Sequence, residues 1–198
     1  MRKNADNIVV KYATEEHVKY AETICRLIND SALQLGTGMA RRKPELVADK
    51  MAGGKAVVAL DGDSIVGFCY IESWSNGEYV ANSALIVHPD YRNLGIATRI
   101  MDKIFQLSRE RFPFAKIFYL TTSAAVISLC KRLGLVTTTY GELTQDDEFW
   151  AGCEGCANYE ILKKNNRLRC LCTGMLYDPK WEMTKKSGRA SSDVAKEI

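Results

Sequence analysis

The sequence lacks the long apolar segments that place a protein across a membrane. No run of apolar residues approaches the roughly 18 that a membrane-spanning helix needs. Residues 1–12 begin with basic side chains but continue with Asn4, Asp6 and Asn7, so they lack the apolar centre of a secretory signal peptide. We therefore expect a cytoplasmic protein without a membrane partner.

An excess of charge of one sign is also missing. The 27 basic and 24 acidic residues are mixed along the chain and leave a formal net charge of +3. Proteins that bind nucleic acid usually gather basic residues on one surface, so this composition gives no reason to expect a nucleic-acid partner. A small anionic ligand suits the net charge equally well.

Internal repeats are absent, and 198 residues are too few for two ordinary domains. We predict one domain over residues 1–180, with its core at about 8–140 and a cysteine-containing extension at about 141–180. Residues 184–198 are rich in Lys, Ser and Ala and present no apolar face, so we expect a disordered tail there. The sequence leaves a homodimer open.

The seven cysteines are an odd number, and a reducing cytoplasm disfavours a disulfide framework. Four of them form one Cys-x-x-Cys and one Cys-x-Cys pair, at Cys153, Cys156, Cys170 and Cys172. Four thiolates can hold zinc tetrahedrally. Because the Cys-x-Cys spacing is less regular than a second Cys-x-x-Cys, we predict no metal site and favour a packing cluster. Zinc and a chance disulfide remain the alternatives.

Hydrophobic periodicity predicts an α/β (α+β) fold with a mixed central sheet, N-terminal helices and an antiparallel meander. Asp-Gly and Asn-Gly turns separate the three strands of the meander. The expected order is a strand at 8–12, a helix from Thr14 to about Leu33, a short helix from Pro44, strands at 55–60, 64–74 and 78–88, a helix at 95–110, a strand at 115–121, a helix at 124–133 and a strand at 135–140. In the extension, residues 158–164 and 167–177 are expected to form a hairpin.

One segment links a hydrophobic strand to a helix through small and basic residues. It reads Arg92, Asn93, Leu94, Gly95, Ile96, Ala97 and Thr98. The first turn of a helix has unpaired backbone N–H groups, and small residues let an anion approach them closely. A lone Gly95 could be an ordinary loop residue. With the strand before it and the helix after it, the segment predicts a pyrophosphate site to which Arg92 adds positive charge.

The run of thirteen residues from Leu85 to Ala97, Leu-Ile-Val-His-Pro-Asp-Tyr-Arg-Asn-Leu-Gly-Ile-Ala, resembles the GNAT superfamily of acyltransferases. The resemblance extends over about residues 8–140 and implies the GNAT fold, with acetyl-CoA or another short acyl-CoA as co-substrate. It also implies that the amides of residues 92–98 hold the pyrophosphate. The strand at Leu85, Ile86 and Val87 is then expected to pair with the pantetheine arm, with the following strand splayed away.

The chain departs from the family pattern after residue 122. Ser123 stands where the family tends to carry Asn, and Cys130 stands where it carries the Tyr that is its usual general acid. An amine attacks a thioester only as the free base, and the departing thiolate needs a proton. We propose Glu72 as the base and Cys130 as the acid. Each has a plainer role as a strand-end carboxylate or a packed thiol, and His88 is a weaker candidate base.

The acceptor amine is expected beside the loop that follows the first helix. Thr37, Arg41 and Arg42 lie in this loop, and adjacent arginines suit a carboxylate. We therefore predict N-acetylation of a primary amine, with an amino acid as the working acceptor. Residues 142–150 and 170–177 also resemble acyltransferases associated with bacterial arginine biosynthesis, which suggests glutamate. The alternatives are a non-catalytic acyl-CoA sensor and a zinc-ribbon interaction module.

Overall fold

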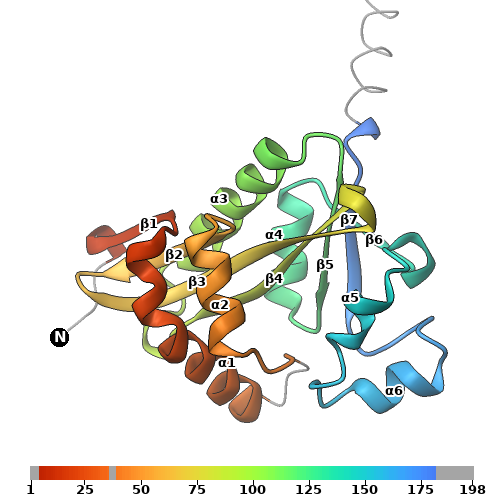
Figure 1. Ribbon diagram of the computed structural model, residues 1–198, viewed down its shortest axis with the longest axis horizontal. Helices are drawn as coiled ribbons and strands as arrows, with labels where there is room; N and C mark the ends of the chain where they lie inside the picture. Colours follow the sequence, from red (N-terminus) through yellow and green to blue (C-terminus); the bar gives the residue numbers. More distant parts are fainter. Residues whose placement is uncertain (1–4, 36–38, 182–198) are drawn as a thin grey trace, which may run out of the picture.

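The computed structural model describes residues 5–35 and 39–181, and a seven-stranded mixed sheet forms its centre (Figure 1). Its spatial order is β1-β2-β3-β4-β5-β7-β6. Only β4 and β5 pair in parallel, and every other neighbouring pair is antiparallel. The strands are β1 (Ile8–Tyr12), β2 (Ala56–Asp61), β3 (Ser64–Trp74), β4 (Tyr79–Val87), β5 (Lys116–Thr121), β6 (Val136–Thr138) and β7 (Thr173–Tyr177).

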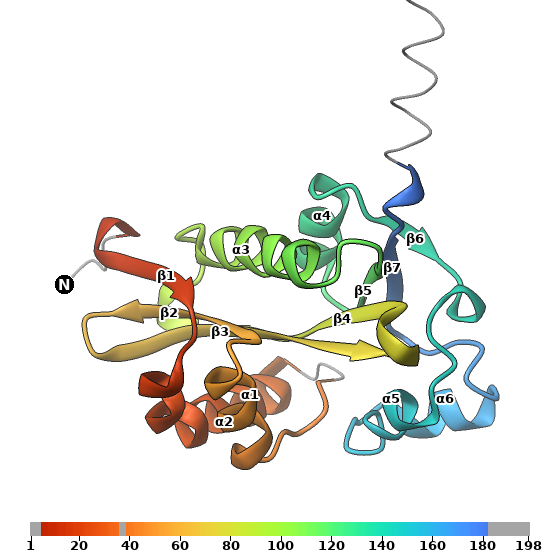
Figure 2. The same cartoon turned by 45° about the horizontal axis from the view of Figure 1, so that its top comes forward.

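Helices cover both faces of the sheet (Figure 2). On one face lie α3 (Ile96–Arg111) and α4 (Ala124–Arg132). On the other lie α1 (Ala21–Leu35), α2 (Pro44–Ala52), α5 (Asp147–Ala151) and α6 (Tyr159–Lys164). The described helices include none that is both long and apolar enough to cross a membrane.

Each face of the sheet has its own apolar core, because side chains alternate along a strand. Toward α3 and α4, buried residues such as Ile71, Ile100 and Ile117 pack together. Toward α1 and α2, Phe68 and Ile28 belong to a second cluster. A third cluster joins the extension to the sheet, and it includes Phe118, Tyr140, Trp150, Leu162 and Leu176.

The predicted mixed α/β fold and its antiparallel meander are confirmed, since β2, β3 and β4 pair in sequence. The start of the expected first helix differs, because Glu15–Tyr20 forms a 3-10 helix before α1 begins. Its N-cap is Thr14, whose backbone N–H donates to Nδ1 of His17 at 3.0 Å. The His17 ring thus takes the part that a Glu plays in the usual capping box.

The hairpin predicted for the extension is wrong. Residues Tyr159–Lys164 form α6, and β7 inserts between β5 and β6 instead of pairing with residues 158–164. The Asn165–Asn166 pair separates the two ranges that were expected to form the hairpin. It lies at the end of the helix, where the Arg167 amide donates to the Leu162 carbonyl at 3.0 Å and Asn166 and Arg167 adopt positive φ.

Candidate active site

A gap in the sheet opens where β4 and β5 separate. The last pair in their parallel ladder joins Ala81 to Phe118, so the strands diverge from Asn82 and Tyr119 onward. Past this point the facing edges of the two strands no longer pair with each other. An extended ligand can bind such an edge through main-chain hydrogen bonds.

A bulge bends β4 inside this gap. Tyr70 of β3 pairs with Ser83 and Phe68 pairs with Ile86, so the register shifts between them. Ala84 has a φ of 55°, which is uncommon for a residue other than glycine. Bulges turn a strand and interrupt its ladder, and they are frequent beside active sites.

The helix start predicted to bind pyrophosphate lies just beyond β4. Gly95 is the N-cap of α3 and has φ 72° and ψ 4°, a left-handed conformation that costs glycine little. A Cβ built on Gly95 would meet no atom within 4 Å, so the space in front of the helix is open. Arg92 donates to the Ser31 hydroxyl at 3.2 Å and ties the loop to α1.

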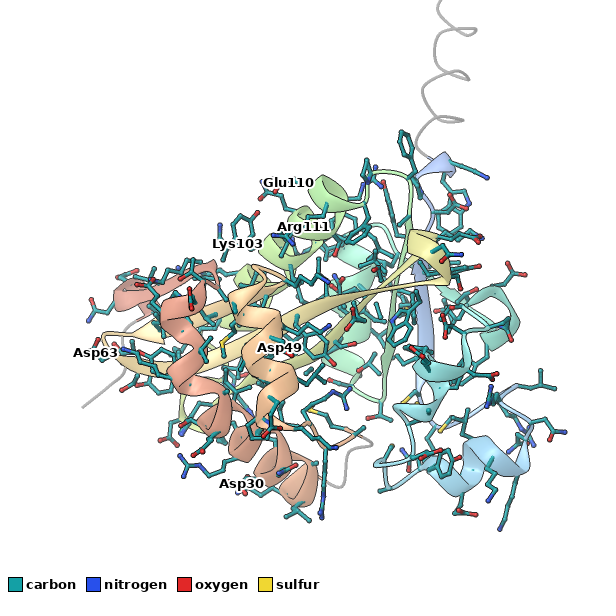
Figure 3. The ribbon with its side chains drawn as sticks, in the orientation of Figure 1. Asp30, Asp49, Asp63, Lys103, Glu110 and Arg111 are labelled. Carbon is teal, nitrogen blue, oxygen red and sulfur yellow. The ribbon has the colours of Figure 1, made fainter. Side chains whose placement is uncertain are left out.

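A cavity of about 770 Å³ lies at the gap, and its lining includes residues of α3 and α4 on one face of the sheet and of α1, α2 and α5 on the other. Of the predicted residues, it is lined by Arg41, Arg42, Glu72, Leu85, Ile86, Val87, Arg92, Ala97 and Ser123. The charged side chains labelled in Figure 3 come from α1, α2, the β2–β3 turn and α3, and none of these six lines the cavity. The charged groups at the cavity are a different set, and they include Arg42, Glu72 and Arg92.

Five of the residues predicted to bind coenzyme A do not line the cavity. Asn93, Leu94, Gly95, Ile96 and Thr98 belong to the helix start but are not among the residues that line the cavity, and Ile96 is buried in the core. Ser123 lines the cavity and also caps α4, because its Oγ accepts the Val126 amide at 3.4 Å. Thr37 and residues 184–198 fall outside the described residues.

Arg42 is a cation at the cavity wall whose guanidinium is anchored by hydrogen bonds. Its Nε donates to the Tyr70 hydroxyl at 2.9 Å and its Nη1 to the Ala40 carbonyl at 2.9 Å. These bonds hold the guanidinium in place and leave Nη2 without a partner among the described residues. The neighbouring Arg41 is exposed and lines the rim.

Glu72 lines the same part of the cavity and is paired with a buried lysine. Lys50 of α2 forms an ion pair with the Glu72 carboxylate, to which its ammonium donates a hydrogen bond. Lys50 is 8% exposed, which is rare for a lysine without a charged partner. The carboxylate therefore has a structural role beside the one predicted for it.

The structure does not bring Cys130 or His88 to the cavity. Cys130 is fully buried between α4 and the sheet, and burial raises the pKa of its thiol to about 12. His88 caps the turn after β4, where its Nδ1 accepts the Asp90 amide at 3.2 Å. Neither residue is among those that line the cavity.

Several cavity residues were missed from the sequence. Asn82, Trp74 and Tyr119 line the cavity, as do Phe149 and Tyr159 of the extension. Strand alternation predicts only which face such residues occupy, and it does not show where two strands separate. Aromatic residues in a sequence usually indicate core packing. Trp74, Phe149 and Tyr159 do belong to the third core cluster, and they also line the cavity.

All four cysteines of the extension line one wall of the cavity. Each of the seven cysteines is a free thiol, and no group of three or more metal-binding side chains is arranged to hold a metal within residues 5–35 and 39–181. Burial is the main cause that raises the pKa of Cys153 to about 11 and that of Cys172 to about 12, and the neighbouring thiols contribute in the same direction.

We expect Cys153 and Cys172 to react slowly with iodoacetamide at pH 7. A thiol with a pKa of about 11 is ionised to roughly one part in ten thousand at that pH, and only the thiolate attacks. The rate of alkylation, measured by peptide mass spectrometry, should be about 100-fold lower for Cys153 and about 1000-fold lower for Cys172 than in the urea-denatured chain. Both rates should rise about tenfold for each pH unit up to pH 10. Protection that disappears only after a chelator is added would contradict this picture and support zinc.

The comparisons with known proteins agree with this geometry. The model of the Acetyltransferase (GNAT) family matches residues 18–135. No curated protein is similar enough to count as a match.

Three of the similar solved structures show how far the likeness extends in identity, coverage and TM-score. N-acetylglutamate synthase of Neisseria gonorrhoeae, solved with coenzyme A and N-acetyl-glutamate, has a TM-score of 0.61 at 15% identity, over 86% of this chain and 35% of that one. Diaminobutyrate acetyltransferase of Paenibacillus lautus has a TM-score of 0.58 at 11% identity, over 87% and 95%. Phosphinothricin acetyltransferase of Sinorhizobium meliloti has a TM-score of 0.57 at 15% identity, over 87% and 88%.

The chain thus spans about a third of the length of the gonococcal synthase and nearly all of the length of the other two. At these identities the likeness is one of fold. The zinc-ribbon alternative does not fit, because the family match covers more than half of the chain and the sheet has the expected meander. The chain belongs to the GNAT acetyltransferase family.

Proposed function

We propose that the chain transfers an acetyl or related short acyl group from acyl-CoA to the amino group of an anionic amino acid, with glutamate as the first candidate. Its family makes it an acyltransferase that uses acyl-CoA as co-substrate. The identity of the amine that receives the acyl group is what our proposal adds. The observation that carries it is the anchored guanidinium of Arg42 beside the cavity.

The acyl-CoA is expected to enter through the gap between β4 and β5. Its diphosphate would meet the free amides at the start of α3, and its pantetheine arm would lie along Leu85 and Val87. The thioester would then lie near the point where the strands separate. From there it faces the acceptor side of the cavity.

Two unused hydrogen-bond donors support an acceptor with a carboxylate. Nη2 of Arg42 has no partner among the described residues, and Nε1 of Trp74 is a buried donor without one. Both residues line the cavity. A guanidinium matches a carboxylate with two parallel hydrogen bonds, and hydrogen bonds to charged groups are the stronger ones.

A second negative charge on the acceptor would be met at the rim. Arg41 and Lys43 are exposed there and line the cavity on either side of Arg42. A dicarboxylic amino acid could place one carboxylate on the anchored Arg42 and the other near these exposed cations. The solved synthase that holds N-acetyl-glutamate has the same fold, which agrees with this choice.

The amine must lose a proton before it attacks the thioester carbonyl, since the ammonium form has no lone pair. Glu72 lines the cavity, as does the exposed Glu148, and Glu72 lies on the same strand as Tyr70 and Trp74. It can accept the proton directly or through a water molecule. Lys50 would hold its carboxylate in place during this step.

A thiol-release assay with acetyl-CoA and succinyl-CoA against the amino acids tests the proposal. We expect release with glutamate or aspartate and little with amines that lack a carboxylate. Binding of acetyl-CoA without release to any amine would instead indicate a sensor and overturn the catalytic assignment.

In the Arg42→Gln variant, kcat/KM for the acceptor should fall roughly 10- to 100-fold, the loss of one charged hydrogen-bonded contact. The affinity for coenzyme A, measured by calorimetry, should stay the same. Arg26→Gln is the matched control, since Arg26 of α1 is exposed and does not line the cavity, and its kcat/KM should change by less than about threefold. Equal effects of the two variants would contradict the carboxylate site.

A further inference from the structure

Polar groups occupy alternate positions near the end of β3. Tyr70, Glu72 and Trp74 are two residues apart, so their side chains leave the strand toward the same face of the sheet. All three line the cavity. Tyr70 belongs to the apolar cluster beneath α1 and α2, and Glu72 pairs with Lys50 of α2, so this is the face that α2 covers. A hydroxyl, a carboxylate and an indole N–H therefore follow one another along one strand.

The Tyr70 hydroxyl has a proton that no other group accepts. Its oxygen accepts Nε of Arg42 at 2.9 Å, so the hydroxyl hydrogen points away from the guanidinium. Within the part of the chain that the structure describes, no atom is placed to accept that hydrogen. The side chain is only 5% exposed, and a buried hydroxyl whose donor is unused costs free energy. A ligand in the cavity can supply the missing hydrogen-bond acceptor.

Arg42 presents a second unused donor beside this hydroxyl. Its Nη1 is occupied by the Ala40 carbonyl at 2.9 Å and the Arg41 carbonyl at 3.2 Å. Its Nη2 lies on the same edge of the guanidinium as Nε, which donates to Tyr70, and it has no partner among the described residues. A carboxylate has two oxygens, and one can accept Nη2 while the other accepts the Tyr70 hydroxyl.

The pair formed by Tyr70 and Arg42 lies close to the predicted base. The Lys50 ammonium, which pairs with the Glu72 carboxylate, is 6.0 Å from the centre of the Tyr70 ring, so both side chains border one cation. Positions two apart on a strand are separated by about 7 Å, and each hydrogen bond takes up about 2.8 Å. A ligand that reaches both groups must therefore carry its carboxylate and its amine close together.

We propose that Tyr70, together with Arg42, binds the carboxylate on the same carbon as the reacting amine, so that the substrate class is α-amino acids acylated on the α-nitrogen. This inference rests on the proposed acyl transfer and names the amine that takes part in it. The α-nitrogen bonds to the thioester carbon, and the C–S bond breaks with its electron pair on sulfur. The proton that the nitrogen loses balances the free thiol of coenzyme A. The side chain of the amino acid then extends toward the exposed cations of the rim.

The two monoamides of glutamate test which carboxylate is bound. Glutamine keeps the α-carboxylate, and isoglutamine has a neutral amide in its place. We expect the wild-type kcat/KM to be at least about tenfold higher for glutamine than for isoglutamine, because hydrogen bonds to a charged group are the stronger ones. No measurable turnover of isoglutamine is the extreme form of this result. Isoglutamine as the better substrate would overturn the inference.

The Tyr70→Phe variant tests the hydroxyl, since it removes a single oxygen. We expect kcat/KM to fall about tenfold for glutamate and for glutamine, mainly through KM. For isoglutamine, where it can be measured, the fall should be less than about threefold. A defect equal for all three amines would indicate general damage to the fold and overturn the inference. Tyr20→Phe is the matched control, because the Tyr20 hydroxyl donates to the Asp63 carbonyl and does not line the cavity, and its activity should stay within about twofold.

A double variant separates donation to the ligand from positioning of Arg42. If Tyr70 donates directly, Arg42→Gln with Tyr70→Phe should lower kcat/KM for glutamate at least about threefold further than Arg42→Gln alone. Equal losses would show that Tyr70 only holds the guanidinium, and they would overturn the donation. Transfer to amines without a neighbouring carboxylate as fast as to glutamate would overturn this inference and leave acyl transfer standing. A wild-type chain inactive with every amine would overturn the proposed function itself.

Discussion

Replacement of Gly95 by aspartate is expected to weaken the binding of coenzyme A by about 100-fold. Gly95 caps α3 with a φ of 72°, and the space around a new Cβ is empty. The added carboxylate would accept the free amides at the helix start and repel the diphosphate. A repulsion of about 2.7 kcal/mol corresponds to 100-fold, and it is within the range for charges a few ångströms apart near a surface.

The control for this prediction is Gly95→Asn. Asparagine has nearly the same size and also tolerates the left-handed conformation, so it introduces the same backbone cost without the charge. Calorimetry should give an affinity for the asparagine variant about tenfold or more above that of the aspartate variant. Both variants should melt within a few degrees of wild type. Wild-type affinity in Gly95→Asp would place the diphosphate somewhere else.

The helix start could be predicted because its signal is local. A hydrophobic strand, a basic residue, a glycine and an amphipathic helix follow one another within about thirty residues. The meander was predictable for the same reason, since each of its turns lies between the strands it joins. These features depend on neighbours in the sequence, which periodicity and turn chemistry describe well.

The cavity depends on contacts between distant residues, and the sequence did not reveal them. Asn82 meets Tyr119 only because β4 and β5 run in parallel for a few residues and then part. Lys50 of α2 pairs with Glu72 of β3, and core packing sets the relative position of this helix and this strand. The strand at 173–177 was expected in a hairpin, yet it fills the place between β5 and β6, because its apolar residues complete the sheet there.

Removing the carboxylate of Glu72 should destabilise the fold, apart from any effect on catalysis. Lys50 is 8% exposed, and Glu72 is its ion-pair partner. In the Glu72→Ala variant, the ammonium would stay buried without a counter-charge. Breaking a buried pair in this way costs about 3 kcal/mol, which urea denaturation should detect as a lower free energy of unfolding. An unchanged free energy of unfolding would show that the pair adds nothing to stability.

A double variant separates the two roles of this carboxylate. Lys50→Met with Glu72→Gln replaces the pair by neutral groups of similar size, and such replacements often restore stability to within about 1 kcal/mol. If Glu72 accepts the proton of the amine, the double variant should fold like wild type and yet turn over about 100-fold more slowly. Its rate should also rise with pH, because at higher pH more of the acceptor reaches the site already as the free amine. A double variant that regains both stability and turnover would make the carboxylate a purely structural partner of Lys50, and the proton of the amine would have to leave through water.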